Sequence, residues 1–192
     1  MSALFFGPVP VTAGMTVLTQ GTGGVSCAAI QLASAAGATV IATSSSAEKL
    51  EVARKLGATH LINYSKTSDW AARVLELTGD VGVDHVVDVV GAETIEGSLR
   101  AARQGGHISV IGNLGERKNV NVVEPLFFGA KSMRGIFGVS DEVLGALMRF
   151  VEEKRVKPFI GRELGWREGT EAFRLLGRRE EVGKIVVRVG GN

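Results

Sequence analysis

The strict alternation of short apolar runs with helix-like segments is the feature that most constrains the fold of this chain. The first run, residues 15–20, is β-branched and apolar, and it ends at a cluster of glycines. Runs of the same kind follow at residues 38–43, 60–64, 85–90 and 106–111. Strands separated by helices pair in parallel through right-handed crossovers, which predicts an α/β fold with a doubly wound parallel sheet, the Rossmann fold.

The segments between these runs carry helix signals. Residues 25–36 are small and are followed by Gly37, and residues 45–48 have the spacing of a capping box that opens a helix ending at Gly57. Further helices are expected from Ser68 to Gly79, at residues 92–102 and, with an amphipathic pattern, at residues 141–154.

The last part of the chain differs from this pattern. A sixth strand is expected at residues 132–138, and after Val156 the residues predict a small strand-helix-strand appendage. We therefore expect a nucleotide-binding domain at residues 1–155 and an appendage at residues 156–192.

Composition excludes several classes of function. The 22 basic and 20 acidic residues leave a net charge of +2, and basic residues do not cluster with aromatic ones, so a nucleic-acid partner is not expected. The single cysteine, Cys27, fits a reducing compartment, with the cytoplasm as the expected location. No apolar run approaches the roughly 20 residues of a membrane span, and we expect neither a span nor a signal peptide.

A glycine cluster lies between the first predicted strand and its helix. It comprises Gly21, Thr22, Gly23, Gly24 and Val25, and Ser26 stands where dinucleotide-binding turns have a third glycine. Backbone N–H groups and the helix dipole at such a turn can hold a pyrophosphate. The alternative is a glycine turn that binds no ligand.

The end of the second predicted strand indicates which dinucleotide is bound. An acidic residue there would bind the adenosine ribose hydroxyls of NAD, but this chain has Ser44, followed by Lys49. Hydroxyl and ammonium donors suit a 2′-phosphate, and Tyr64 ends the next strand. The sequence therefore favours NADP(H). In the alternative interpretation, Lys49 is a solvated helix residue and Tyr64 is a packing aromatic.

Several motifs together resemble one family. Residues 14–26, 55–58, 62–64, 89–91, 105–112 and 182–186 are similar to the medium-chain dehydrogenase/reductase family, in its quinone oxidoreductase and zinc-type alcohol dehydrogenase-like branches. The resemblance implies a cofactor bed made of four groups of residues. Its residues are Gly23, Gly24 and Val25 for the pyrophosphate; Ser44, Lys49 and Tyr64 for the 2′-phosphate; Val90, Gly91, Ile111 and Gly112 for the ribose and nicotinamide; and Phe137, Gly138 and Lys184 near the nicotinamide end. Core packing explains Val90 and Ile111 equally well.

The chain also departs from that family. Members have a large catalytic domain before the first Rossmann strand, whereas only 14 residues precede it here, so the resemblance implies a truncated member whose appendage is a remnant of the catalytic domain. No catalytic residue can be carried over. With one cysteine and three dispersed histidines, His60, His85 and His107, no zinc is expected.

Other polar residues are interpreted as structural. Asp88, inside an apolar strand, needs hydrogen-bond partners and is expected to be a satisfied structural aspartate. Cys27 is expected to be a buried, inert thiol.

Three functions remain open. The leading one is an NADPH-dependent oxidoreductase with a small-molecule alcohol, quinone or enone substrate. The second is a non-catalytic NADP(H)-binding module that acts as a sensor or scaffold. The third, an S-adenosylmethionine methyltransferase, usually has an acid where Ser44 stands. An unguarded edge at residues 132–138 also predicts a homodimer through the sixth strand.

Overall fold

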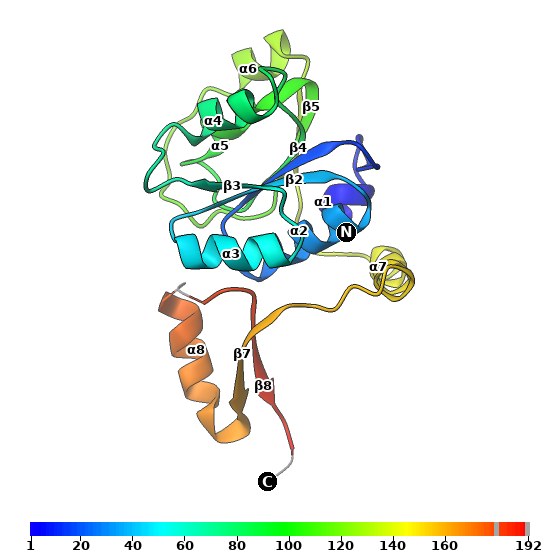
Figure 1. Ribbon diagram of the computed structural model, residues 1–192, viewed down its shortest axis with the longest axis vertical. Coiled ribbons are helices and arrows are strands. Elements are labelled where there is room, and N and C mark those ends of the chain that lie inside the picture. Colours follow the sequence, from blue (N-terminus) through cyan, green and yellow to red (C-terminus); the bar gives the residue numbers. More distant parts are fainter. Residues whose placement is uncertain (179–180, 191–192) are drawn as a thin grey trace.

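A six-stranded parallel sheet forms the centre of the molecule (Figure 1). The computed structural model describes residues 1–178 and 181–190. The strand order is β3-β2-β1-β4-β5-β6, and each neighbouring pair is parallel, which confirms the predicted Rossmann fold. The strands are β1 Thr16–Gln20, β2 Thr39–Ser44, β3 His60–Asn63, β4 Val83–Asp88, β5 Ala102–Val110 and β6 Ser132–Gly135.

Helices cover both faces of this sheet and divide the core in two. One hydrophobic cluster lies under α1 (Ser2–Phe5), α2 (Gly24–Ala35), α3 (Ala47–Lys55) and α7 (Asp141–Glu153). The other lies under α4 (Trp70–Leu77), α5 (Ile95–Ala101) and α6 (Val123–Phe128). Val17 points into the first cluster and Leu18 into the second, and both are fully buried. Burial on both faces explains why β1 is a continuous apolar run rather than an alternating one.

Two helices begin one residue later than the sequence pattern predicts. Ser46, not Ser45, caps α3, because its Oγ accepts a hydrogen bond from the Lys49 backbone N–H at 3.4 Å. Asp69, not Ser68, caps α4 by accepting from the Ala72 N–H at 3.0 Å. Adjacent residues of the same capping type made both positions plausible from sequence.

The region around the sixth strand also differs from the prediction. Helix α6, between β5 and β6, was not expected, nor was the short α1. Strand β6 ends at Gly135 rather than Gly138, and the Phe137 side chain beyond it is fully exposed. Gly138 has a φ of +75°, which turns the chain away from the strand direction.

The predicted C-terminal strand-helix-strand unit is present as a separate two-stranded parallel sheet, at the lower end of Figure 1. It consists of β7 (Ile160–Gly165), a 3₁₀ turn (Trp166–Glu168), α8 (Gly169–Arg178) and β8 (Lys184–Arg188). The Gly183 N–H donates to the Thr22 carbonyl at 2.9 Å, and Gly183 forms a parallel bridge with Gly23. The unit is therefore joined to the glycine turn after β1.

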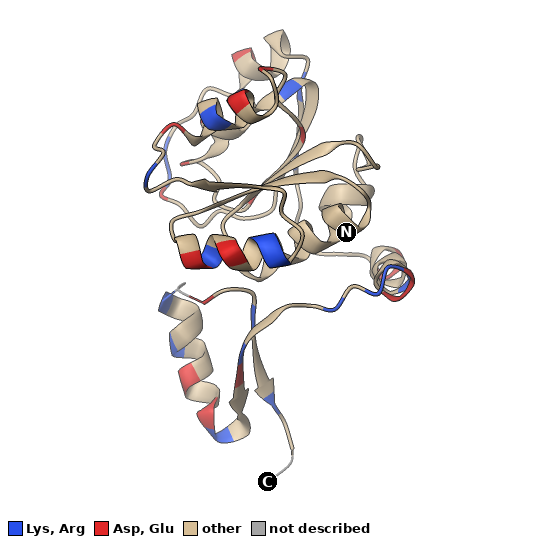
Figure 2. Ribbon diagram, viewed as in Figure 1, with Lys and Arg blue, Asp and Glu red and all other residues tan. Residues whose placement is uncertain are grey.

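Charged residues of both signs are mixed along the surface helices α3 and α8 (Figure 2). Several form exposed pairs three residues apart, such as Arg54 with Glu51 and Arg174 with Glu171, and such pairs contribute only a few tenths of a kcal/mol. Within the described part of the chain, no helix has the length and apolar character needed to cross a membrane.

Candidate cofactor site

The glycine turn adopts the conformation that a dinucleotide-binding turn requires. Gly21, directly after β1, has a φ of +71°, a backbone region that favours glycine. Gly23 is the N-cap of α2. Ser26 is buried in the first turn, and its hydroxyl donates to the Gln20 carbonyl at 2.7 Å. That hydrogen bond explains how serine is accommodated where helix and strand pack closely.

The first turn of α2 presents backbone donors that no described side chain caps. No side chain caps this 12-residue helix, and its first turn contains no acidic residue. A Cβ placed on Gly23 would meet no atom within 4 Å, so the space in front of the turn is open. Free N–H groups and the positive end of a helix dipole facing open space can bind a phosphate group.

Lys184 supplies a cation at the same turn. A Cβ placed on Gly24 would lie 2.7 Å from Lys184 Cδ and 3.1 Å from its Nζ, so the lysine side chain crosses the first residue of α2. The resemblance places this residue near the nicotinamide end of the bed. In the structure Lys184 lies beside the glycine turn after β1, because the Gly183 bridge brings the start of β8 to Gly23.

Ser44 and Tyr64 lie side by side at the ends of β2 and β3. The Ser44 carbonyl accepts from the Tyr64 N–H at 3.0 Å. Ser44 is 3% exposed, yet its hydroxyl forms no hydrogen bond within the described residues, whereas Tyr64 is 44% exposed. Lys49 lies in the first turn of α3, which begins at this same edge. The three residues predicted to hold a 2′-phosphate therefore come from neighbouring elements.

Two further charged residues, Glu48 of the predicted capping box and Lys66, interact near the start of α3. Glu48, in the first turn of α3, accepts a hydrogen bond from the Ser46 hydroxyl. That bond, followed by smaller effects that include the charge of Lys66, lowers the pKa of the Glu48 carboxyl. Lys66 lies in the turn after β3, and only the fold brings it near α3. The sequence carries no spacing signal for this pair.

The turns after β4 and β5 pack closely against each other. Gly91 has a φ of +95°, and a Cβ on Gly112 would lie 2.1 Å from the Val89 carbonyl oxygen, so neither position accommodates a larger residue without a shift. Ile111 packs against the first core cluster, and Val90 is half-buried. Both turns lie at the carboxyl edge of the sheet, where ligands bind in doubly wound folds.

An apolar pocket of about 310 Å³ opens beside these turns. Its lining residues come from the segments that follow β4 and β5, from the start of α5 and from β6, and they include Gly91, Ile95, Gly112, Lys118 and Met133. The pocket lies on the same side of the sheet as α5, because two of its lining residues are at the second core cluster. Ile95 belongs to that cluster, and Val110 packs against it. Phe137 and Gly138, predicted to lie near the nicotinamide, do not line it.

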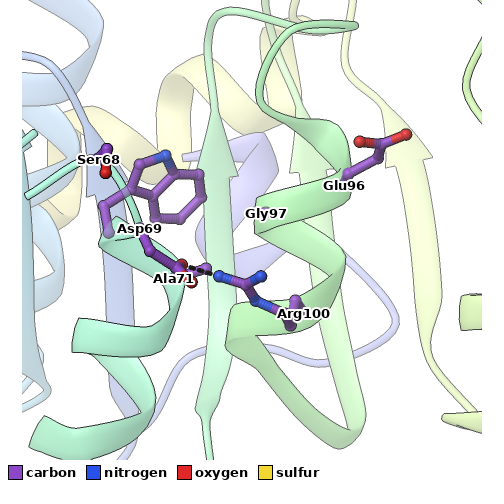
Figure 3. Close-up of a pocket in the computed structure, with 7 residues that line it drawn as sticks. Ser68, Asp69, Ala71, Glu96, Gly97 and Arg100 are labelled. Carbon is purple, nitrogen blue, oxygen red and sulfur yellow. Dashed lines mark hydrogen bonds and ion pairs between the residues drawn. The ribbon is translucent and has the colours of Figure 1, made fainter.

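A second pocket, of about 440 Å³, lies between α4 and α5 (Figure 3). Trp70 packs on Gly97, where a Cβ would come within 2.4 Å of the indole ring. Arg100 forms an ion pair with Asp69 across the pocket. None of the predicted cofactor residues lines it, and its one ion pair already satisfies its arginine.

The residues that could bind a metal do not form a site. Cys27 is buried, its Sγ lies 3.2 Å from the Thr22 carbonyl, and burial raises the pKa of its thiol to about 11. His85 and His107 are both buried and in ring contact. In residues 1–178 and 181–190, no group of three or more histidine, cysteine, aspartate or glutamate residues could hold a metal ion. These residues do not fit a zinc centre.

Comparisons with known proteins agree with this geometry. The model of the zinc-binding dehydrogenase family matches residues 24–153, more than half of the chain. A zinc-type alcohol dehydrogenase-like protein of Schizosaccharomyces pombe is 38% identical over 183 residues, which are 93% of this chain and 53% of that protein. The chain therefore spans about half the length of the curated relatives it matches.

Solved structures show the same relationship. The crystal structure of an NAD-dependent alcohol dehydrogenase is 39% identical, with a TM-score of 0.87 over 94% of this chain and 52% of that one. A mycobacterial protein complexed with NADPH is 27% identical, with a TM-score of 0.79 over 93% of this chain and 58% of that one. Structural relatives of the chain thus bind NADP(H).

Proposed function

The chain belongs to the medium-chain dehydrogenase/reductase family of zinc-binding dehydrogenases, and on that premise we propose that it is the NADP(H)-binding part of an oxidoreductase. The observation that carries the proposal is the turn after β1. There, an uncapped helix N-terminus, an open glycine and the Lys184 side chain meet at one point. The helix N-terminus and Lys184 offer hydrogen-bond donors and positive charge. A pyrophosphate offers the matching acceptor oxygens and negative charge.

The preference for NADP(H) rests on the end of β2. Ser44 stands where NAD-binding domains have an acid, and its hydroxyl is unpaired within the described residues. Lys49 lies in the first turn of α3, which begins at this edge. One structural relative is named NAD-dependent and another is complexed with NADPH, so the chain's own residues decide the proposal.

The protein's role in the reaction is to bind and orient. A bound nicotinamide supplies or accepts the hydride. The α2 N-terminus and Lys184 would hold the pyrophosphate, Ser44 and Lys49 would hold the 2′-phosphate, and the turns at Val90–Gly91 and Ile111–Gly112 would contact the ribose. We propose an alcohol, quinone or enone as the substrate, the class that the family resemblance implies. No step is assigned to zinc, because the described residues do not fit a zinc site.

A non-catalytic NADP(H)-binding module is the alternative. Turnover separates the two functions. The chain is incubated with NADPH and a panel of quinones, enones and aldehydes, and NADPH oxidation is followed by absorbance. Oxidation that depends on both protein and substrate supports the oxidoreductase, and NADPH binding without any turnover supports the module.

We also propose that two copies pair through β6. This strand is the last in the sheet order, so its outer side has no neighbouring strand. Exposed apolar side chains lie on and around it, at Val123, Phe127, Phe128, Phe137 and Val139. An open edge beside apolar surface favours edge-to-edge association.

A further inference from the structure

A buried polar network joins the carboxyl ends of β1 and β4, and Asp88 is at its centre. Asp88 ends β4 and is fully buried. Its Oδ1 accepts from the Val90 and Gly91 N–H groups at 3.0 and 2.8 Å, and its Oδ2 accepts from the Ser98 hydroxyl at 2.7 Å. The Thr94 hydroxyl lies 3.0 and 2.9 Å from the two oxygens. The carboxylate therefore binds the whole turn from β4 into α5.

Gln20 extends this network to the glycine turn. Its Nε2 donates to Asp88 Oδ2 at 3.2 Å and to Ser98 Oγ at 2.7 Å. Its backbone carbonyl accepts from the Ser26 hydroxyl, in the first turn of α2, at 2.7 Å. A continuous set of hydrogen bonds thus runs from the Val90–Gly91 turn through Asp88 and Gln20 to the turn that faces the pyrophosphate position.

The network is arranged at a cost in stability. Facing a carboxylate, the Gln20 amide must turn its nitrogen inward, and its Oε1 is then buried with no hydrogen-bond partner in the described residues. A buried unpaired acceptor destabilises a fold and is uncommon in native proteins. The hydrogen bonds to Asp88 and Ser98 therefore fix the orientation of the Gln20 amide.

We propose that Asp88 is a positioning residue that fixes the Val90–Gly91 turn relative to the glycine turn, so that both contact one dinucleotide. This inference rests on the proposed function. The turn has little freedom to compensate, because Gly112 packs directly against the Val89 carbonyl. A displaced turn would weaken the binding of any dinucleotide that contacts both turns, whether or not it carries a 2′-phosphate.

Asp88→Asn tests the proposal with little change of shape. The substituted side chain places an amide nitrogen where Oδ2 lies, and the Gln20 amide can rotate so that its own oxygen accepts from that nitrogen. The fold is therefore retained, while one charge-assisted set of bonds to the turn is weakened. We expect the Kd values of NADPH and NADH to rise by the same factor, about tenfold.

Asp84→Asn is the matched control. Asp84 lies on the same strand at the opposite edge, where it accepts from the Thr16 N–H at 2.7 Å and from Arg103 Nε at 2.7 Å. The Asp84→Asn variant should have a lower melting temperature than the wild type, with unchanged Kd values for NADPH and NADH. Thr94→Val, which removes only one hydroxyl donor to Asp88, is a second, milder variant that should raise both Kd values by a smaller common factor.

Calorimetric titration of each variant, with its melting temperature measured in parallel, tests the positioning role of Asp88. The proposal is overturned if Asp88→Asn binds both cofactors as the wild type does, or if Asp84→Asn loses the same affinity at an equal loss of melting temperature. A wild-type chain that binds neither cofactor would overturn the proposed function and this inference with it. Normal wild-type binding with unchanged variants would overturn this inference alone.

Discussion

Lys49 and Lys184 reach the proposed cofactor bed from different elements and predict different effects on the two nicotinamide cofactors. Lys49 belongs to α3, beside the end of β2, where NADP and NAD differ by a phosphate group. Lys184 begins β8 and crosses Gly24 at the start of α2, where the pyrophosphate is common to both. The pair therefore separates 2′-phosphate recognition from pyrophosphate recognition.

Lys49→Ala should weaken NADPH binding by about 1–3 kcal/mol, the range for a hydrogen bond to a charged group, and leave NADH binding nearly unchanged. Titration calorimetry measures both affinities. Lys55→Ala is the control, because Lys55 ends the same helix and is exposed. An equal loss for NADPH and NADH would remove the assigned role from Lys49.

Lys184→Met should weaken the binding of NADPH and of NADH by the same factor. Methionine keeps much of the apolar stem that lies on Gly24 and removes the ammonium group, so packing is retained while the charge is lost. Fluorescence titration of both reduced cofactors checks the ratio. Discrimination between the two cofactors, rather than a common loss, would show that Lys184 lies elsewhere in the complex.

Single residues were predictable where a local spacing rule applies. The glycine turn and the serine at the end of β2 follow from their distance to a strand end, and the structure has both where the pattern places them. The place of Lys184 and the proximity of Glu48 to Lys66 were not predictable, because each depends on contacts between segments remote in sequence.

At the scale of elements, β4 and β5 carry two buried imidazoles under the N-terminal segment. His85 and His107 are register partners with ring centroids 4.9 Å apart, and His85 Nδ1 and His107 Nε2 have no hydrogen-bond partner in the described residues. Burial, and then the neighbouring His107, lowers the pKa of His85 to about 4, although the Val9 backbone and Asp84 partly offset this. Burial, followed by the charge of Arg134, also lowers the pKa of His107.

The free energy of unfolding should therefore fall as the pH drops from 6.5 to 4. In that window the unfolded chain binds a proton at His85 and the folded chain does not, so stability is complete above the unfolded pKa of 6.5 and is lost towards 4. At about 1.4 kcal/mol per pH unit, His85 alone accounts for about 3 kcal/mol. Urea denaturation across this range measures the slope.

His85→Gln is the variant that isolates this effect from the carboxyl groups that also titrate in acid. Glutamine is neutral at every pH in this range. The difference in free energy of unfolding between the wild type and His85→Gln should therefore shrink as the pH falls. Parallel profiles for the wild type and the variant would contradict the assignment to His85.

Most elements were predictable because their patterns are local. Helix α7 shows where this stops: its predicted stripe includes Leu144 and Met148, but these are 47% and 64% exposed while Leu147 and Val151 pack on the core. Periodicity identifies a face of a helix but not how much of it the neighbouring elements cover. Helices α1 and α6 have only four and six residues, too few to establish a helical period.

At the scale of the whole molecule, β6 leaves one edge of the sheet open. We expect light scattering at micromolar concentration to give twice the 20.2 kDa of one chain. The Ile136 N–H donates inward to Val110 at 2.8 Å, so the alternation of a strand turns the Gly135 N–H outward. Gly135→Pro removes that outward donor and should shift the mass towards the monomer.

A Cβ on Gly135 would meet no atom within 4 Å, so the substitution does not crowd the subunit itself. Circular dichroism verifies that the variant stays folded. A wild-type monomer at every accessible concentration, or a Gly135→Pro dimer of unchanged stability, would exclude pairing through β6.

The parallel pairing of the strands follows from the alternation of strands and helices, but the position of the C-terminal unit does not. Only the structure shows that Gly183 bridges to Gly23 and so brings Lys184 to the cofactor bed. In the proposed site, β2 and α3 therefore set the cofactor preference, and β8 supplies a cation at the pyrophosphate position that both cofactors share.

Calorimetric titration of the wild-type chain with NADPH, NADH and S-adenosylmethionine tests the proposed preference for NADP(H) most directly. We expect NADPH to bind with a stoichiometry of one per chain and more tightly than NADH, because Ser44 and Lys49 stand where an acid would select NAD. S-adenosylmethionine should not bind. Equal affinities for NADPH and NADH would contradict the proposed 2′-phosphate site, and the absence of binding by both would contradict the proposed cofactor function.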